Sequence, residues 1–217
     1  YSAFSSGLAV SPRGLGSMAS MVVAGVLANR IDNRWLLMFG FLLFGVSTIM
    51  LSDLNLSIGM GSVVVPNILN GFAGGFIFVP LTTMAMGRLA RQDIGNAAGI
   101  YNLIRNIGGS VGIASVTALL IRRGQVHQNY IAASVTPTAG GLAHGLEAYF
   151  RSSGADAVSA HQMALGALYQ NLEQQASLLA YVDNFRLLAY LSLVCVPIVL
   201  LFQGVRRSRG EKIVIEE

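Results

Sequence analysis

Charged side chains are scarce in this chain of 217 residues, where Asp, Glu, Lys and Arg make up 11% of the total, against roughly 25% in soluble globular domains. Residues 54–87 contain none, and 53% of the whole chain is hydrophobic. A helix that crosses a bilayer needs about 20 mostly apolar residues, and this uncharged interval is longer. The scarcity of charge therefore argues against a soluble domain and predicts an all-α, polytopic membrane helix bundle.

Cysteine is also nearly absent, because Cys195 is the only one in the chain. A single thiol within an apolar stretch excludes an internal disulfide framework and a cysteine metal cluster. The three histidines, His127, His144 and His161, lack the spacing of metal ligands, and we interpret them as exposed. No Ser-His-Asp set, H-E-x-x-H motif or phosphate-binding P-loop is found. We therefore expect neither an enzyme nor a bound metal or cofactor.

Five long apolar segments are present instead. We predict spanning helices at residues 6–28, 35–54, 58–86, 97–121 and 187–205. The chain then divides into three parts. Residues 1–121 hold four transmembrane helices, residues 122–184 form an external loop with amphipathic helices, and residues 185–217 hold the last transmembrane helix and a basic cytoplasmic tail.

Basic residues indicate how these helices are oriented. Most of the fourteen Lys and Arg lie in two turns and in the tail, at Arg30, Arg34, Arg88, Arg91, Arg206, Arg207, Arg209 and Lys212. Cytoplasmic loops carry an excess of such residues. We therefore expect both turns and the C-terminus in the cytoplasm, the N-terminus outside, and the protein in the inner (plasma) membrane.

The long segment before the last span is predicted to hold helices at residues 126–133 and 161–181. Between them, residues 134–154 are rich in Thr, Ser, Gly and Ala and are interpreted as a loop. The second helix carries a mostly apolar stripe at helical spacing, made of Leu165, Leu168, Leu172, Gln175 and Leu179. We expect this stripe to be buried against lipid, the rim of the bundle or a partner.

Arg105 is the strongest candidate for contact with a substrate, because it lies deep within a predicted span. A charge there costs at least about 2.5 kcal/mol and normally faces the bundle interior or an aqueous cavity. Asn102 shares its helix face, and Asn106 lies beside it. The alternative is a structural charge that pairs with backbone carbonyls or with a carboxylate of another span.

The third predicted span adds Asn67, Asn70 and Phe78 to the candidate substrate cavity. Amides in lipid need hydrogen-bond partners, so the two asparagines contact either substrate or another helix. Phe78 suits a cavity wall, a helix interface or lipid. Arg13, in the first span, either extends to the outer interface or takes part in gating or substrate binding.

Glycines four positions apart, with three residues between them, predict close helix packing, because small side chains let helix backbones approach. Such pairs occur at Gly71 and Gly75 and at Gly108 and Gly112. The alternative is that each pair acts as a hinge during transport.

Several motifs carry a family resemblance. Residues 25–34 read Gly-Val-Leu-Ala-Asn-Arg-Ile-Asp-Asn-Arg and resemble the cytoplasmic G-x-L-x-D-R-x-x-x-R loop of the major facilitator superfamily, with Asn29 in place of the usual Asp. Residues 11–18, 80–83 and 102–112 are similar to segments of its fourteen-span drug:proton antiporters, the EmrB/QacA-like permeases. The resemblance covers essentially the whole chain, which would then be the last five of fourteen spans.

The resemblance implies a proton-coupled multidrug efflux permease that exports amphiphilic, hydrophobic compounds by alternating access. It implies that Arg30, Asp32 and Arg34 form a cytoplasmic-loop latch. The expected partners are membrane lipid, amphiphilic small molecules and protons, with a periplasmic adaptor and an outer-membrane channel as further candidates, and no nucleic acid. The principal proton-coupling acids of the family lie in its N-terminal half. Two alternatives stay open, namely a non-transporting membrane scaffold and an uptake transporter of the same superfamily.

Overall fold

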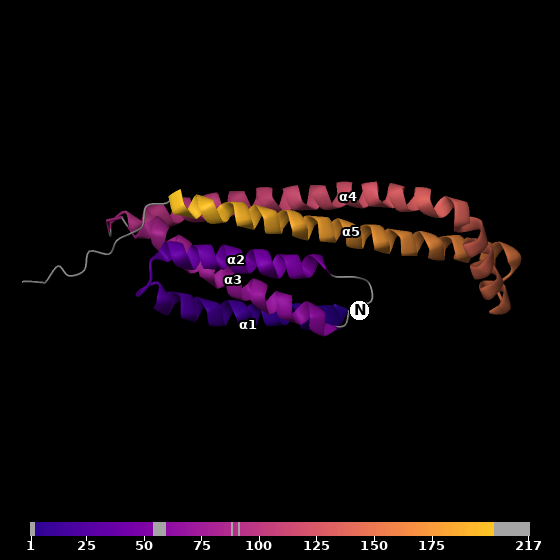
Figure 1. The fold of residues 1–217 in the computed structure, drawn as a ribbon, viewed down its shortest axis with the longest axis horizontal. Coiled ribbons are helices and arrows are strands. Elements are labelled where there is room, and N and C mark those ends of the chain that lie inside the picture. The colour runs from indigo at the N-terminus through magenta and orange to yellow at the C-terminus, as the bar shows by residue number, and fades with distance from the viewer. Residues whose placement is uncertain (1–2, 54–59, 88, 91, 202–217) are drawn as a thin grey trace, which may run out of the picture. The chain divides into compact units, whose positions relative to one another are not determined.

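The structure, a computed structural model, describes residues 3–53, 60–87, 89–90 and 92–201. These residues form five α-helices and no strand (Figure 1): α1 (Ala3–Leu27), α2 (Asn33–Ser52), α3 (Met60–Met86), α4 (Ile94–Ser152) and α5 (Ala157–Leu201). All five are long and apolar enough to cross a membrane. The predicted all-α, polytopic bundle is therefore confirmed. Arg88, Arg91 and the basic tail, on which part of the predicted orientation rests, lie outside the described residues.

The chain divides into two compact units. The first contains α1, α2 and α3, together with α4 up to Ile107 and α5 from Leu188. The second contains Gly108–Leu187, together with the described residues Ser52 and Asp53. Residues 108–187 cover the end of α4, the turn after it and the start of α5, and are called the hairpin below.

Small residues bring α1 and α3 into close contact in the first unit. A Cβ added to Gly71 would collide with the carbonyl oxygen of Arg13, and one added to Gly75 would collide with Ser20 Oγ. In contrast, a Cβ at Gly108 or Gly112 would meet no heavy atom of a neighbouring element within 4 Å. The backbones of α1 and α3 can therefore approach only because these two positions of α3 lack a side chain.

The core of the first unit lies where α1, α2 and α3 meet near the turn after α1. Ala24, Leu36 and Phe76 come from these three helices and are at most 4% exposed. The Phe76 ring lies edge-on to that of Phe39, with 5.2 Å between the ring centroids. This core holds the three helices together beside the cavity described below.

The predicted loop at residues 134–154 is wrong, because α4 continues to Ser152 and α5 begins at Ala157 after a short turn. The helices predicted at 126–133 and 161–181 are parts of α4 and α5. Thr and Ser lower helix stability by less than about 1 kcal/mol each and Gly by about that amount, while each added residue of an existing helix gains a hydrogen bond. Pairing with α5 supplies the remaining stabilisation, so the segment between the last two spans is helical.

Alanine, rather than leucine, forms the buried seam of the hairpin. Ala160, Ala164, Ala176 and Ala180 are at most 3% exposed, and a Cβ on Gly124 of α4 would lie 4.0 Å from Ala180 Cβ. The predicted stripe is therefore only partly right. Leu168 and Leu172 are half-buried, whereas Leu165 and Leu179 are 48% and 40% exposed and Gln175 is exposed. Small side chains are buried here because they allow two helices to lie close together.

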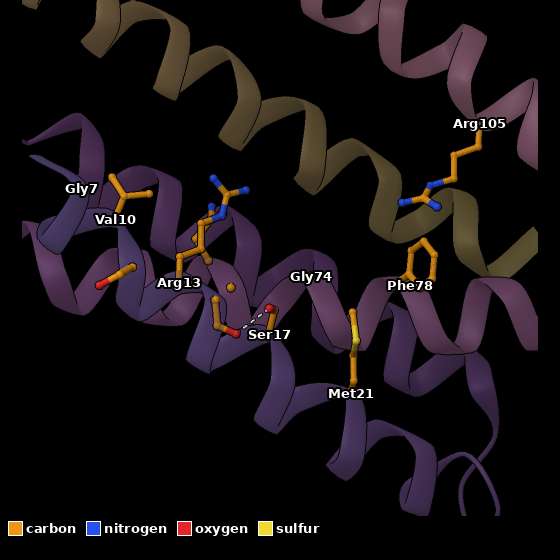
Figure 2. A pocket seen from close by; sticks show the side chains of 12 residues that line it. Gly7, Val10, Arg13, Ser17, Met21, Gly74, Phe78 and Arg105 are labelled. Atoms are coloured by element: carbon orange, nitrogen blue, oxygen red, sulfur yellow. Dashed lines mark hydrogen bonds between the residues drawn. The ribbon is translucent and has the colours of Figure 1, made fainter. Parts of the chain in front are cut away.

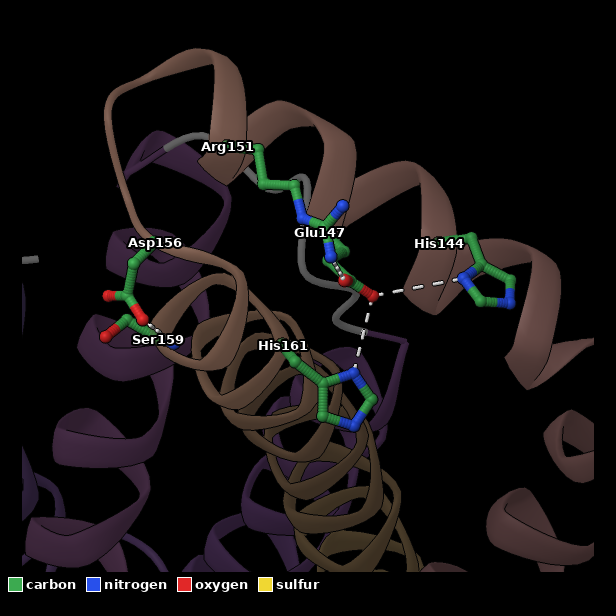
Figure 3. A network of polar contacts seen from close by, with 6 residues as sticks. All are labelled: His144, Glu147, Arg151, Asp156, Ser159 and His161. Atoms are coloured by element: carbon green, nitrogen blue, oxygen red, sulfur yellow. Dashed lines mark hydrogen bonds and ion pairs between the residues drawn. The ribbon is translucent and has the colours of Figure 1, made fainter.

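The turn at the tip of the hairpin has two local causes. Gly154 has φ 98°, a left-handed conformation that glycine adopts without steric cost. Asp156 precedes α5, and its Oδ2 accepts a hydrogen bond from the Ser159 N–H at 3.4 Å (Figure 3), as helix N-caps do. Hydrogen bonds from the side chain and backbone of Ser159 lower the pKa of the Asp156 carboxyl.

Candidate substrate cavity

A cavity of about 710 Å³ opens in the first unit between α1, α3 and α4 (Figure 2). This volume lies within the usual range for small-molecule sites, about 300–1,000 Å³. Twelve residues line it: Gly7, Val10, Ser11, Arg13, Gly14, Ser17 and Met21 of α1, Asn70, Gly71, Gly74 and Phe78 of α3, and Arg105 of α4.

The lining residues follow helix periodicity. On α1 they recur at intervals of three and four residues, as do Asn70, Gly74 and Phe78 on α3, so each helix presents one face to the cavity. Glycine makes the space available, because a Cβ at Gly14 or Gly74 would meet no heavy atom within 4 Å. The cavity is therefore a consequence of which residues the two helices place on their shared side.

Arg105 reaches the cavity from α4 and lies over an aromatic ring. Its guanidinium carbon is 4.3 Å from the centroid of the Phe78 ring (Figure 2), a cation–π contact worth about 0.5–2 kcal/mol depending on desolvation. No ion pair to Arg105 is present among the described residues. The positive charge is thus positioned at the cavity by a ring and not neutralised by a carboxylate of the described chain.

Arg13 is the second cation of the cavity. The sequence leaves its role open between contact with the interface and contact with substrate, and the structure places it with Ser17 and Met21 on the cavity side of α1 (Figure 2). Sequence reasoning missed Ser17 and Met21. Their spacing of four and eight residues from Arg13 is the signal that could have identified them.

Asn70 both lines the cavity and joins two helices. Its side chain is buried, and its Nδ2 donates a hydrogen bond to Ser47 Oγ of α2 at 3.3 Å. Asn67 donates instead to the Val63 carbonyl of its own helix, at 2.9 Å. The cavity therefore includes Asn70 but not Asn67.

The other α4 candidates lie outside the cavity. Asn102 and Asn106 are exposed and are not among its lining residues. Tyr101, one position before Asn102, shares a hydrogen bond with Thr82 of α3 at 3.3 Å. Of the six predicted cavity residues, the structure thus brings together Asn70, Phe78 and Arg105.

The turn after α1 borders a second cavity, of about 660 Å³. Arg30 and Asp32 line it, and Arg34 does not. The Nε of Arg34 is buried without a hydrogen bond to the described residues. Within that part of the chain no ion pair joins these three side chains, so the latch stays a prediction.

The histidines of the hairpin have acidic partners. His127 Nε2 lies 2.9 Å from Asp183 Oδ2. His161 Nδ1 lies 3.4 Å from Glu147 Oε2, and Arg151 pairs with the other oxygen of Glu147 at 2.5 Å (Figure 3). The hydrogen bond with His161 is the largest cause that lowers the pKa of Glu147, and the Arg151 charge adds to it. No group of three or more metal-ligand side chains with suitable geometry is found in the described residues.

Comparison with known proteins agrees with this architecture. Residues 1–142 match the family model of the Major Facilitator Superfamily. Fatty acid resistance protein FarB of Neisseria gonorrhoeae is 28% identical over 210 residues, which are 97% of this chain and 40% of FarB. Probable multidrug resistance protein EmrY of Escherichia coli K12 is 31% identical over 136 residues, 62% of this chain and 27% of EmrY.

Multidrug export protein EmrB of Escherichia coli K12 is 28% identical over 138 residues, which are 63% of this chain and 27% of EmrB. The chain thus spans at most 40% of the length of these relatives. The five apolar helices, the turn motif and the family match point to one conclusion: the chain belongs to the major facilitator superfamily of transporters, as an EmrB-like, multi-pass membrane protein.

Proposed function

We propose that this chain forms part of the substrate pathway of a proton-coupled multidrug efflux permease that exports amphiphilic, hydrophobic compounds. The observation that carries the proposal is the cavity between α1, α3 and α4. Polar groups and apolar side chains meet in it, and this combination suits a ligand with one polar end. Its polar members include Arg13, Ser17, Asn70 and Arg105, and its apolar members include Val10, Met21 and Phe78.

Transport would follow the alternating-access scheme, in which helical halves rock around a site near the middle of the bilayer. The glycine contacts of α1 with α3 support motion of these two helices as a unit, because a tightly packed pair resists relative sliding. Arg30, Asp32 and Arg34 would act as the latch that stabilises one access state through ion pairs with neighbouring helix ends.

Proton coupling is part of the same proposal. No Asp or Glu is found among the described residues that line the cavity. We therefore place the proton-carrying carboxylate in the portion of the relatives' length that this chain does not span.

Residues 122–184 of the hairpin would lie on the external side of the inner membrane, with the C-terminus in the cytoplasm. There they would contact a periplasmic adaptor that hands the exported compound to an outer-membrane channel. Two exposed leucines, Leu165 and Leu179, support this proposal because they lie close to one face of α5. Replacing both with Asp should abolish crosslinking to the adaptor, whereas Gln174→Asp on the same helix should not. Retained crosslinking in the Leu variant would argue against this surface.

The described residues favour a transporter over a membrane scaffold. A scaffold needs no polar cavity inside its bundle, yet two arginines that form no ion pair with the described residues line this one. Since an intramembrane charge costs at least about 2.5 kcal/mol, a bundle without a transport role would gain stability from apolar residues at these positions.

Cysteine accessibility in the full-length protein tests the proposal. In a Cys195→Ser background, Ser17→Cys and Met21→Cys should react with a water-soluble maleimide, and an amphiphilic substrate should slow both reactions. Ile104→Cys is the control, because Ile104 is 64% exposed on α4 but does not line the cavity. Equal, slow labelling at all three positions would favour the scaffold.

A further inference from the structure

We infer that the base of the hairpin binds an anionic phospholipid by its phosphate group, through a band of arginines on α4 and α5. The band, called the basic band below, consists of Arg122 and Arg123 of α4 and Arg186 of α5, and all three are exposed. The inference goes beyond the proposed function, because it requires only that both helices cross a membrane.

The basic band lies where two apolar helical segments end. On α4 no charged residue occurs between Arg105 and Arg122, and on α5 none occurs from Leu187 to Leu201. Both helices are long and apolar enough to cross a membrane. Arginines that flank a span place their charged ends at the level of the lipid head groups. The first charges that follow these two apolar segments therefore belong to the head-group layer.

Pairing between the helices puts the arginines at a common level. A short turn connects α4 to α5, so the two helices run antiparallel in the hairpin. Arg123 Nη1 lies 3.8 Å from Asp183 Oδ2, and Arg186 follows Asp183 by three residues, or about 4.5 Å of helix. Arg122 adjoins Arg123. The head-group layer is about 5–7 Å thick on each side of the bilayer, so the basic band fits within it.

The basic band keeps a net positive charge. Asp183 is occupied by α4, because its Oδ2 lies 2.9 Å from His127 Nε2 as well as 3.8 Å from Arg123. No ion pair joins Arg122 or Arg186 to any acid of the described residues. Guanidinium N–H groups form a fork that matches the oxygens of a phosphate. Each of these two arginines can therefore bind a lipid phosphate without first breaking an ion pair.

Exposed apolar side chains adjoin the two arginines on their membrane side. Ile121 precedes Arg122 and is 59% exposed, and Leu187 follows Arg186 and is 41% exposed. Tyr181, on the other side of Arg186, is 51% exposed, and tyrosine is enriched where membrane meets water. A free anion would leave Ile121 and Leu187 without a partner. The acyl chains of a phospholipid would cover them, so the surroundings favour a lipid over a soluble phosphate.

Native mass spectrometry of the full-length protein tests the inference. The probes are phosphatidylglycerol and phosphatidylcholine with identical dioleoyl chains, and phosphatidylglycerol should bind more tightly. An arginine near a membrane surface strengthens binding of anionic lipid roughly fivefold. Arg122→Gln and Arg186→Gln should each weaken phosphatidylglycerol binding by about this factor, and the double variant by about 25-fold if the two act independently. Phosphatidylcholine binding should change less than about twofold, because its head group carries no net charge.

The matched control is Arg151→Gln, the same substitution near the tip of the hairpin, where Arg151 is exposed and pairs with Glu147. It should leave the affinity for both lipids unchanged. Arg122→Lys and Arg186→Lys keep the charge but not the fork, so they should lose less phosphatidylglycerol binding than the Gln variants. Equal loss of both lipids in the Gln variants would show a purely structural role for the arginines and would overturn the inference.

Salt provides a test that depends on no variant. Raising ammonium acetate from about 0.05 M to about 0.5 M shortens the screening length roughly threefold. The preference of the unmodified protein for phosphatidylglycerol should therefore fall. A preference that salt does not alter, or equal binding of the two lipids at low salt, would overturn the inference.

Two further outcomes identify the ligand and separate this inference from the proposed function. Displacement of phosphatidylglycerol by inorganic phosphate would indicate a site for soluble anions and would overturn the assignment to a lipid. Efflux without any preference for phosphatidylglycerol would overturn the inference alone. An arginine-dependent preference in a protein that exports nothing would retain the lipid site and overturn the proposed function alone.

Discussion

At the scale of single residues, the contact with the Phe78 ring holds the positive charge of Arg105 at the wall of the cavity. Without the ring, the guanidinium would keep its charge but lose its position. The proposed site therefore depends on an uncharged residue as much as on its cations.

Phe78→Leu should consequently weaken binding of an exported substrate that contacts Arg105, although it removes no charge. The lost cation–π contact is worth about 0.5–2 kcal/mol, which corresponds to roughly 2- to 30-fold in affinity. Phe78→Trp should retain binding, because Trp is the best cation–π partner. Titration calorimetry with the full-length protein in nanodiscs measures both. Equal affinity in the Leu and Trp variants would contradict the role of the ring.

Glu147 gives the hairpin tip a defined pH dependence. Its pKa is lowered in the folded state from the ordinary value of 4.5, first by His161 and then by the charges of Arg151, His161 and His144. A carboxyl with a lowered pKa stabilises the fold above its ordinary value, and this stabilisation is lost as the pH falls through the lowered pKa. We expect the tip to be protected at pH 7 and to open progressively below pH 4.5.

Hydrogen exchange of residues 144–161 between pH 7 and pH 3 measures this opening. Glu147→Gln is the control, because it keeps the shape of the side chain but cannot titrate. The variant should exchange faster at pH 7 and show a weaker pH dependence below pH 4.5. An identical profile in both proteins would remove Glu147 as the cause.

At the scale of helices, the contact between α1 and α3 depends on two glycines. Gly71→Ala and Gly75→Ala would each place a Cβ against Arg13 backbone or Ser20, and overpacking of this kind costs about 1–3 kcal/mol. Gly61→Ala, on the same helix, would meet nothing within 4 Å and should be neutral or stabilising by up to about 1 kcal/mol. Thermal unfolding should thus show a lower midpoint for the Gly71 and Gly75 variants and an unchanged or higher midpoint for Gly61→Ala.

Local sequence signals predicted some helices better than others. The three N-terminal helices were predictable because long apolar runs and paired glycines are local features. The helix at residues 134–152 was not predictable from its own sequence, because Thr, Ser and Gly are typical of a loop. The alanine seam of α5 is not visible in this segment. That seam is a property of two distant segments, so it depends on tertiary pairing.

The cavity was predictable to a similar extent. Asn70, Phe78 and Arg105 could be found as polar or aromatic residues within spans. Asn102 could not be excluded and Met21 could not be found, because helix periodicity gives the relative positions of residues on one helix. It does not give the rotation of that helix against its neighbours, which side-chain packing determines.

At the scale of the whole molecule, the helix lengths sharpen the expected topology. At about 1.5 Å per residue, the 59 residues of α4 give about 88 Å of helix, roughly three times the 30 Å hydrocarbon core. A large part of α4 must therefore lie outside the hydrocarbon core. The polar residues after Ile121, beginning with Arg122 and Arg123, indicate that this part follows the span.

Reporter fusions can test the orientation. A fusion in the turn at Asp32 should report a cytoplasmic location, and one at Gly154, in the turn of the hairpin, should report an external location. The physical reason is the excess of Lys and Arg near the first turn and in the tail. A cytoplasmic signal at Gly154 would mean that the number of membrane crossings between Asp32 and Gly154 differs from the prediction. The turn of the hairpin would then lie in the cytoplasm.

The contacts between α4 and α5 along the hairpin also affect the order in which its parts fold. The pair of Glu147 and His161 closes a loop of 14 residues, whereas the pair of His127 and Asp183 closes one of 56. Loop-closure entropy makes the longer closure costlier by about 1.2 kcal/mol when nothing has formed between the ends. The hairpin should therefore begin to fold at its tip, around Gly154, and then close towards its base like a zipper. Each tip contact shortens the loop that the next must close, so the residues at the base of the hairpin should be the last to become ordered.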